Sequence, residues 1–137
     1  MKKIDVSISW SGKNYAALAS GEIINGSVLI TNKSLFDLKN EFKESLEFHF
    51  EAAIQDGDTF PDWILKKEYE LNFILETSAL LRYATKYTSL AAISRASKIN
   101  QRQLSHYANA RSVPREPQRQ RIVEGLHEIG KEFLSFV

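Results

Sequence analysis

The sequence predicts an α+β fold class, in which a small sheet-bearing unit is followed by an all-α unit. In the first half of the chain, apolar residues alternate with polar ones over short segments, the period of a strand with one buried face. Elsewhere they recur at spacings of three and four, the period of an amphipathic helix. The strand period gives way to the helix period near Thr77, so we expect one domain at residues 1–76 and another at residues 77–137.

Four strands and one helix are expected in the first domain. Ser34, with Asp37 three residues on, resembles a capping box and opens a helix over residues 34–53. The apolar positions of this helix are Leu35, Leu38, Phe42, Leu46 and Phe50. Gly57 and Pro61 end the helical pattern. The strands are predicted at residues 4–10, 15–19, 28–31 and 69–75, which gives the order βββαβ.

Four or five helices are expected in the second domain. Thr77 is a candidate N-cap for the first of them, in which Leu80, Ala84 and Tyr87 share one face. Prolines frame the start of the last helix, whose apolar residues form a single stripe. The residues of this stripe are Ile122, Leu126, Ile129 and Phe133.

Residues 91–107, AAISRASKINQRQLSHY, are the most informative stretch of the chain. A short helical pattern passes through a tight turn into a second helix, and Ile99, Leu104 and Tyr107 are the expected core positions. This is the layout of a helix-turn-helix, whose second helix enters the DNA major groove. The stretch therefore predicts sequence-specific DNA binding.

Three residues of the second helix are candidate base readers: Gln101, Arg102 and His106. Gln can bond adenine N6 and N7, and Arg can bond guanine O6 and N7 in bidentate fashion. A phosphate contact is the alternative for Arg102, and a surface position without base contact is the alternative for His106. The candidate contacts to the DNA backbone are Arg95, Asn100, Ser105, Arg111 and Arg115. Helix capping is the alternative for Asn100 and Ser105, and a solvated surface is the alternative for the arginines.

The charge is distributed unevenly along the chain. Residues 1–87 hold 10 Lys and Arg against 13 Asp and Glu, a net charge of −3, whereas residues 88–137 hold 8 against 4, a net charge of +4. Between Arg95 and Arg121 there are seven basic residues and a single acid, Glu116. Such a segment suits phosphate binding, with a solvated charged face as the alternative.

The composition excludes several classes of protein. At 137 residues, 43% of them hydrophobic and 26% charged, the chain is typical of a globular protein. It has no cysteine, so disulfides and thiolate zinc sites are excluded. There is no run of 18 apolar residues, and we expect a soluble, cytoplasmic protein that does not bind a membrane. His49 and His127 have no neighbours at metal-ligand spacing, so no metal and no cofactor are expected.

The segment from Ile99 to Phe133, with the strings QLSHY and GLHEIGKEF, resembles the Xre/Cro type of helix-turn-helix as it occurs in HicB antitoxins. The βββαβ order, with residues 31–35 (TNKSL) leading into the helix, is similar to the partial RNase H-like fold of the same antitoxins. The resemblance implies that the first domain binds and blocks a HicA-type toxin, a small mRNA-cleaving ribonuclease. It implies that the second domain binds operator DNA as a dimer or higher oligomer. Repressors of this type usually have Gly where this chain has Lys98 and Ala110, and a positive φ at either position would cost about 1 kcal/mol.

The placement of the acidic residues in the first domain bears on whether the chain is an enzyme. RNase H-type catalysis needs several of them converging on two metal ions. Asp5 lies on the first predicted strand, but no second acid is placed beside it on a neighbouring strand in a way that indicates a metal site. Four acids, Glu41, Glu44, Glu47 and Glu51, are expected on the solvated face of the helix. We therefore expect no catalytic residue and no enzymatic activity, and we interpret the chain as an antitoxin and autorepressor. The alternative is a stand-alone prophage-type repressor whose first domain serves oligomerisation or effector sensing.

Overall fold

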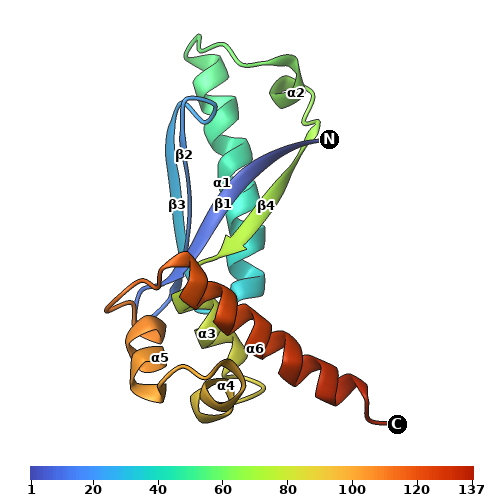
Figure 1. Ribbon diagram of the computed structural model, residues 1–137. Coiled ribbons are helices and arrows are strands. Elements are labelled where there is room, and N and C mark those ends of the chain that lie inside the picture. The colour runs from blue at the N-terminus through green and yellow to red at the C-terminus, as the bar shows by residue number, and fades with distance from the viewer. The chain divides into compact units, whose positions relative to one another are not determined.

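The computed structural model describes residues 1–137 and is an α+β protein with a four-stranded mixed sheet and six helices (Figure 1). It divides into two compact units, Met1–Leu75 (unit 1) and Glu76–Val137 (unit 2), within one residue of the expected boundary. No helix combines the length and the apolar character needed to cross a bilayer.

Unit 1 is a sheet with one long helix across one of its faces (Figure 1). The strands are β1 Lys2–Trp10, β2 Tyr15–Gly21, β3 Gly26–Asn32 and β4 Tyr69–Leu75, and the helices are α1 Leu35–Gln55 and α2 Asp62–Leu65. The strands lie in the order β3-β2-β1-β4, in which β1 and β4 run parallel and the other pairs antiparallel. The expected strands and long helix are present, and α2 is a single turn that the sequence pattern did not predict.

The helix α1 forms for the reasons that the sequence indicated. The Ser34 hydroxyl accepts a hydrogen bond from the Asp37 N–H at 3.2 Å, and all five predicted apolar positions are buried. One of them, Phe42, packs edge-to-face against Phe73 of β4, with ring centroids 6.3 Å apart, and Val6 and Ile8 of β1 are fully buried. Each fully buried Leu, Ile or Phe contributes about 1.5–3 kcal/mol relative to exposure. The helix runs two residues past its expected end and stops at a turn where Gly57 has a φ of +94°.

Unit 2 contains four helices: α3 Thr77–Ala84, α4 Leu90–Ser97, α5 Gln101–Ala108 and α6 Glu116–Leu134. They enclose a core of six buried residues, namely Leu81, Ile93, Ile99, Leu104, Tyr107 and Ile122. Along α6, Leu126 and Ile129 pack on the edge of this core, whereas Phe133 is 58% exposed. The predicted α6 stripe is therefore buried only in its first part.

Two expectations for α3 are corrected by the structure. The N-cap is Glu76, and Thr77 is the first helical residue. The buried Thr77 hydroxyl accepts a hydrogen bond from the Arg119 guanidinium at 2.8 Å. The predicted face of Leu80, Ala84 and Tyr87 is correct only at Ala84, which packs against the core. Leu81, not Leu80, is the fully buried leucine, and Tyr87 is 72% exposed beyond the end of the helix. Both differences arise from tertiary contacts that local patterning does not encode.

Candidate nucleic-acid interface

The α4 and α5 helices are joined by a turn of only three residues, 98–100. The Ser89 hydroxyl caps α4 by accepting a hydrogen bond from the Ala92 N–H at 3.1 Å. At the other end of α4, Lys98 adopts the left-handed conformation with a φ of 60°, and its N–H donates to the Ser94 carbonyl at 2.8 Å. This single bond is the pattern of an αL helix stop, in which Gly is the usual residue.

The turn is held by side chains as well as by the backbone. The Ser94 hydroxyl donates to the Ile99 carbonyl at 2.6 Å, and the Arg121 guanidinium donates to the Lys98 carbonyl at 2.8 Å. On α6, Gly125 lies so close to α4 that an added Cβ would stand 3.0 Å from the Ser97 nitrogen. The end of α4 is therefore fixed against α6, and the start of α5 is fixed with it.

The α5 helix presents two of the predicted base readers, Arg102 and His106, on the side opposite its core residues, and the third, Gln101, is its first residue. Leu104 and Tyr107 are buried, whereas Gln101 and Arg102 at the start of the helix are exposed. His106 follows one turn later on the outward side and is half-buried. The arrangement brings Arg102 and His106, four residues apart, onto one face of α5, and leaves Gln101 exposed at the start of the helix.

Asn100 and Ser105, the polar candidates for backbone contact, are both engaged within α5. The Asn100 side-chain oxygen accepts a hydrogen bond from the Arg102 N–H at 2.8 Å, so Asn100 caps the helix. Ser105 is half-buried, and its hydroxyl accepts from the Asn109 amide at 3.4 Å.

The end of α5 is a second left-handed stop. The Ala110 N–H donates to the Tyr107 carbonyl at 3.1 Å, and the Arg111 N–H donates to the His106 carbonyl at 2.9 Å. This pair of bonds defines a Schellman motif, with Ala110 at a φ of 58° where Gly is preferred. The segment that follows carries the exposed residues Arg111 and Arg115, both predicted to contact phosphate.

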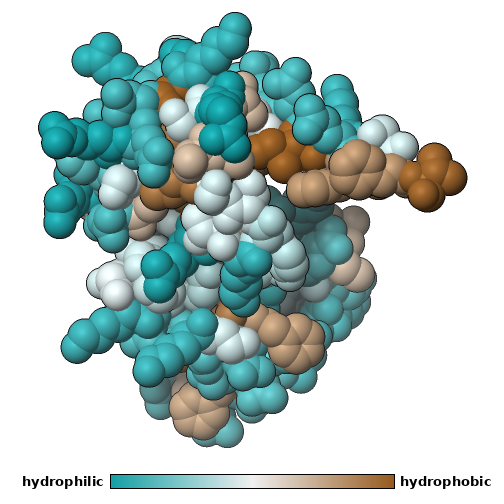
Figure 2. Space-filling model, turned by 90° about the horizontal axis from the view of Figure 1, so that it is seen from below, coloured by the Kyte–Doolittle hydropathy of each residue, from teal (hydrophilic) through white to brown (hydrophobic).

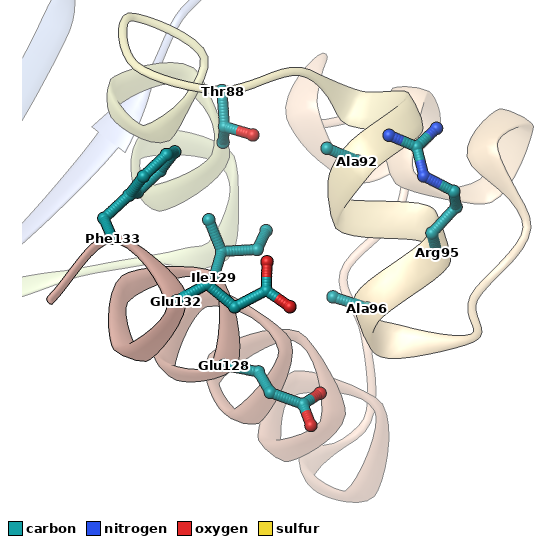
Figure 3. Close-up of a pocket in the computed structure, with 8 residues that line it drawn as sticks. All are labelled: Thr88, Ala92, Arg95, Ala96, Glu128, Ile129, Glu132 and Phe133. Atoms are coloured by element: carbon teal, nitrogen blue, oxygen red, sulfur yellow. The ribbon is translucent and has the colours of Figure 1, made fainter. Parts of the chain in front are cut away.

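Arg95 is not grouped with the α5 residues. It lies on α4 at one wall of a groove of about 420 Å³ between α4 and α6 (Figure 3). The opposite wall carries two carboxylates, Glu128 and Glu132. Because carboxylates repel phosphate, this surrounding is less suited to DNA than the α5 face.

Two of the seven basic residues between Arg95 and Arg121 have internal roles. Arg119 donates to the Thr77 hydroxyl, and Arg121 donates to the Lys98 carbonyl and, at 3.0 Å, to the Gln118 side chain. They hold α6 to α3 and to the α4–α5 turn. Counting charge along the sequence gave no signal of this role.

Unit 1 contains no cluster resembling a metal centre. The His49 Nε2 atom lies 2.7 Å from the Ile24 carbonyl, and the Asp5 carboxylate accepts a hydrogen bond from the Asn72 amide at 2.9 Å. Asn72 is the β4 residue paired with Asp5 in the sheet register, so an amide stands next to the strand acid. No three His, Cys, Asp or Glu side chains in the chain are placed to hold a metal ion.

Comparison of the chain with protein-family models, with curated proteins and with solved structures finds no match. The functional interpretation therefore depends on the residues and their geometry, together with the sequence resemblance described above.

Proposed function

We propose that unit 2 is an Xre/Cro-type helix-turn-helix domain that binds operator DNA, with α5 as the recognition helix. The observation that carries this proposal is the α4–turn–α5 geometry, in which a rigid three-residue turn holds a capped helix with Gln101 and Arg102 exposed at its start. Side chains at this position of a recognition helix read base edges in the major groove. Arg111 and Arg115 supply charge beside α5 for phosphate contacts.

We propose that unit 1 is a partial RNase H-like domain that binds and blocks a HicA-type toxin. Support comes from the βββαβ order, from the resemblance to HicB antitoxins, and from the net negative charge of residues 1–87. A toxin that cleaves mRNA must bind a polyanion, so an acidic partner is electrostatically suited to it. The Asn72 amide beside Asp5 favours a binding role for unit 1 over metal-dependent catalysis.

The proposed repressor acts as a dimer or higher oligomer, because one short recognition helix contacts few base pairs. The end of α6 offers an apolar surface for self-association, with Phe133 58% and Leu134 85% exposed. Figure 2 shows apolar residues, in brown and tan, gathered on the side where Figure 1 marks the C-terminus. Recognition helices of a two-fold dimer lie in successive major grooves, about 34 Å apart.

The test combines an operator assay with a toxin assay on one variant. Gln101→Ala/Arg102→Ala should abolish protection of two related half-sites upstream of the operon and leave neutralisation of the adjacent toxin intact in co-expressing cells. Arg102→Ala alone should change the base preference at one position, at a cost of about 1–3 kcal/mol, whereas Arg115→Ala should weaken binding to all sequences alike. Growth arrest despite normal abundance of the double variant would refute the division of labour. A wild-type protein that binds its operator but neutralises no neighbouring toxin would favour the stand-alone repressor.

A further inference from the structure

The β4 strand forms one edge of the sheet in unit 1 and is paired with another strand on one side only (Figure 1). Its seven residues, Tyr69–Leu75, pair one for one with β1, so the strand is regular and has no bulge. It contains no proline and a single charged residue, Glu70. Prolines, charges and bulges are the usual protection of an exposed edge, because the free N–H and C=O groups of a regular edge bind another strand. The β4 edge is therefore suited to pairing.

A groove of about 270 Å³ lies between this edge and α1. The backbone of α1 lies closer to β2 and β3 than to β4, so the β4 side chains that face the helix are only partly covered. Tyr69, Leu71 and Phe73 are half-buried. Ile4 and Val6, the β1 residues paired with the last two, are buried. The edge therefore offers apolar side chains as well as backbone groups to a further strand.

Three charged side chains of α1 follow this edge in step with the strand. Lys39 and Lys43 line the groove, and the Lys39 Nζ lies 5.4 Å from the centre of the Phe73 ring. Burial raises the pKa of the Tyr69 hydroxyl, and the carboxylate of Glu47 raises it further, so Glu47 lies near Tyr69. Four helical residues span about 6 Å and two strand residues about 6.6 Å, so Lys43 lies level with the middle of β4.

The order of these charges is suited to an antiparallel copy of the same edge. None of the three side chains forms an ion pair within unit 1, and along the edge their charges run positive, positive, negative. If two β4 strands pair about a two-fold axis at Leu71, Tyr69 of each copy lies opposite Phe73 of the other. Lys39 of each copy then faces Glu47 of the other. This pairing brings opposite charges together at two symmetric positions.

The neighbouring registers are less favourable. An axis at Asn72 would place Lys39 of one copy against Lys43 of the other, and an axis at Glu70 would oppose two carboxylates directly. With the axis at Leu71, the two Lys43 side chains are the one pair of like charges along the groove. The charges therefore select the Leu71 register.

We propose that β4 pairs with β4 of a second copy of this chain, antiparallel and centred on Leu71, so that two four-stranded sheets join into one. The contact consists of backbone hydrogen bonds between the edges, cross-strand pairs of Tyr69 with Phe73, and two ion pairs of Lys39 with Glu47. It is separate from the apolar end of α6 and requires neither DNA nor a toxin. A chain that associates through both surfaces assembles beyond the dimer.

A disulfide cross-link on the full-length protein tests the register. The chain has no cysteine, so Leu71→Cys introduces one thiol per chain. Residues directly opposite each other in an antiparallel pair have Cα atoms about 4.5–5.5 Å apart, which is within the range of a disulfide. Oxidised Leu71→Cys should therefore run as a covalent dimer. The control is Leu29→Cys on β3, the other edge strand, where Leu29 is 61% exposed; it should remain unlinked.

Sedimentation of charge variants tests the ion pairs. Lys39→Glu and Glu47→Lys should each raise the dissociation constant of the assembly by about ten-fold or more, because each variant places like charges together at two symmetric positions. The double variant Lys39→Glu/Glu47→Lys exchanges the charges and should return to within about three-fold of wild type. Lys43→Gln should lower the dissociation constant, because it removes the like charges at the axis. The matched controls Lys13→Glu and Glu22→Lys, at exposed positions outside the groove, should have no effect.

Three outcomes would overturn the inference. A wild-type protein with the mass of one chain at high concentration has no such contact. A double charge variant that is weakened by the sum of its two single effects would show that Lys39 and Glu47 do not pair between copies. Cross-linking of Leu29→Cys in place of Leu71→Cys would move the contact to β3 or to the open face of the sheet.

Discussion

Replacement of Gly125 by Ala should destabilise unit 2, although alanine is the better helix former. The Cβ added at Gly125 would stand 3.0 Å from the Ser97 nitrogen and 3.1 Å from the Ser97 Cβ, closer than ordinary van der Waals contact. Ser97 is the last residue of α4, and the backbone there is fixed by the bonds of the α4–α5 turn. Relief of this close approach needs a shift of a few tenths of an ångström in the backbone of α4 or α6.

Gly130→Ala, on the same helix, is the control for Gly125→Ala, because it measures the effect of helix propensity on the free energy of unfolding without the close contact. A Cβ at Gly130 would meet no atom within 4 Å, so Gly130→Ala should raise the free energy of unfolding by up to about 1 kcal/mol. At Gly125 the same gain is opposed by an overpacking cost of about 1–3 kcal/mol. The two variants should therefore differ by about 1–3 kcal/mol, with Gly125→Ala the less stable.

Urea unfolding of the full-length protein can report each unit separately. Far-UV circular dichroism mainly follows unit 2, because its helices have 8, 8, 8 and 19 residues against 21 and 4 in unit 1. Tryptophan fluorescence follows unit 1, which contains both Trp10 and Trp63. The fluorescence transition should not move in either variant. Equal stabilisation by Gly125→Ala and Gly130→Ala would refute the close approach of α6 to α4.

Two further predictions concern the α4–α5 turn and the cations beside it. Lys98→Gly and Ala110→Gly should each raise the free energy of unfolding of unit 2 by about 1 kcal/mol, because the φ values of 60° and 58° strain any residue with a Cβ. Lys98→Ala keeps the strain and serves as the control, so a gain equal to that of Lys98→Gly would contradict the assignment of the left-handed stop. Arg121→Met should lower the free energy of unfolding by about 1 kcal/mol through loss of the bond to the Lys98 carbonyl. Arg111→Met should instead leave stability unchanged and reduce the slope of log affinity against log salt by about one unit. An Arg121→Met protein of normal stability and reduced salt slope would place Arg121 on the DNA instead.

The parts of the fold that depend on local periodicity could be predicted from the sequence. The four strands and α1 repeat their apolar residues at regular intervals, and the buried face of α1 matches the predicted positions one for one. The same holds for Ile99, Leu104 and Tyr107, which are buried as expected. A helix of four residues such as α2 is too short to show a period, and it was missed.

The features that could not be predicted depend on residues distant in the sequence. Arg119 bonds Thr77, 42 positions away, and Thr77 is the buried first residue of α3 instead of the expected cap. Leu80 and Leu81 are adjacent and chemically identical, so only the packing of α3 determines which of them is buried. Gly125 carries no local signal either, because its importance lies in the approach of α4.

The charges of the candidate interface likewise depend on contacts between residues that are distant in the sequence. Sequence counting treats Arg95, Arg111, Arg115, Arg119 and Arg121 as equivalent cations, yet the structure gives them three different surroundings. Arg119 and Arg121 bond to the protein itself, and Arg95 shares a groove with Glu128 and Glu132. Arg111 and Arg115 remain exposed on the segment that follows α5. Because affinity for a polyanion depends on cations that can neutralise its phosphates, the number of phosphate contacts inferred from net charge is an upper bound. The salt dependence of operator binding should accordingly be less steep than seven basic residues per chain would give.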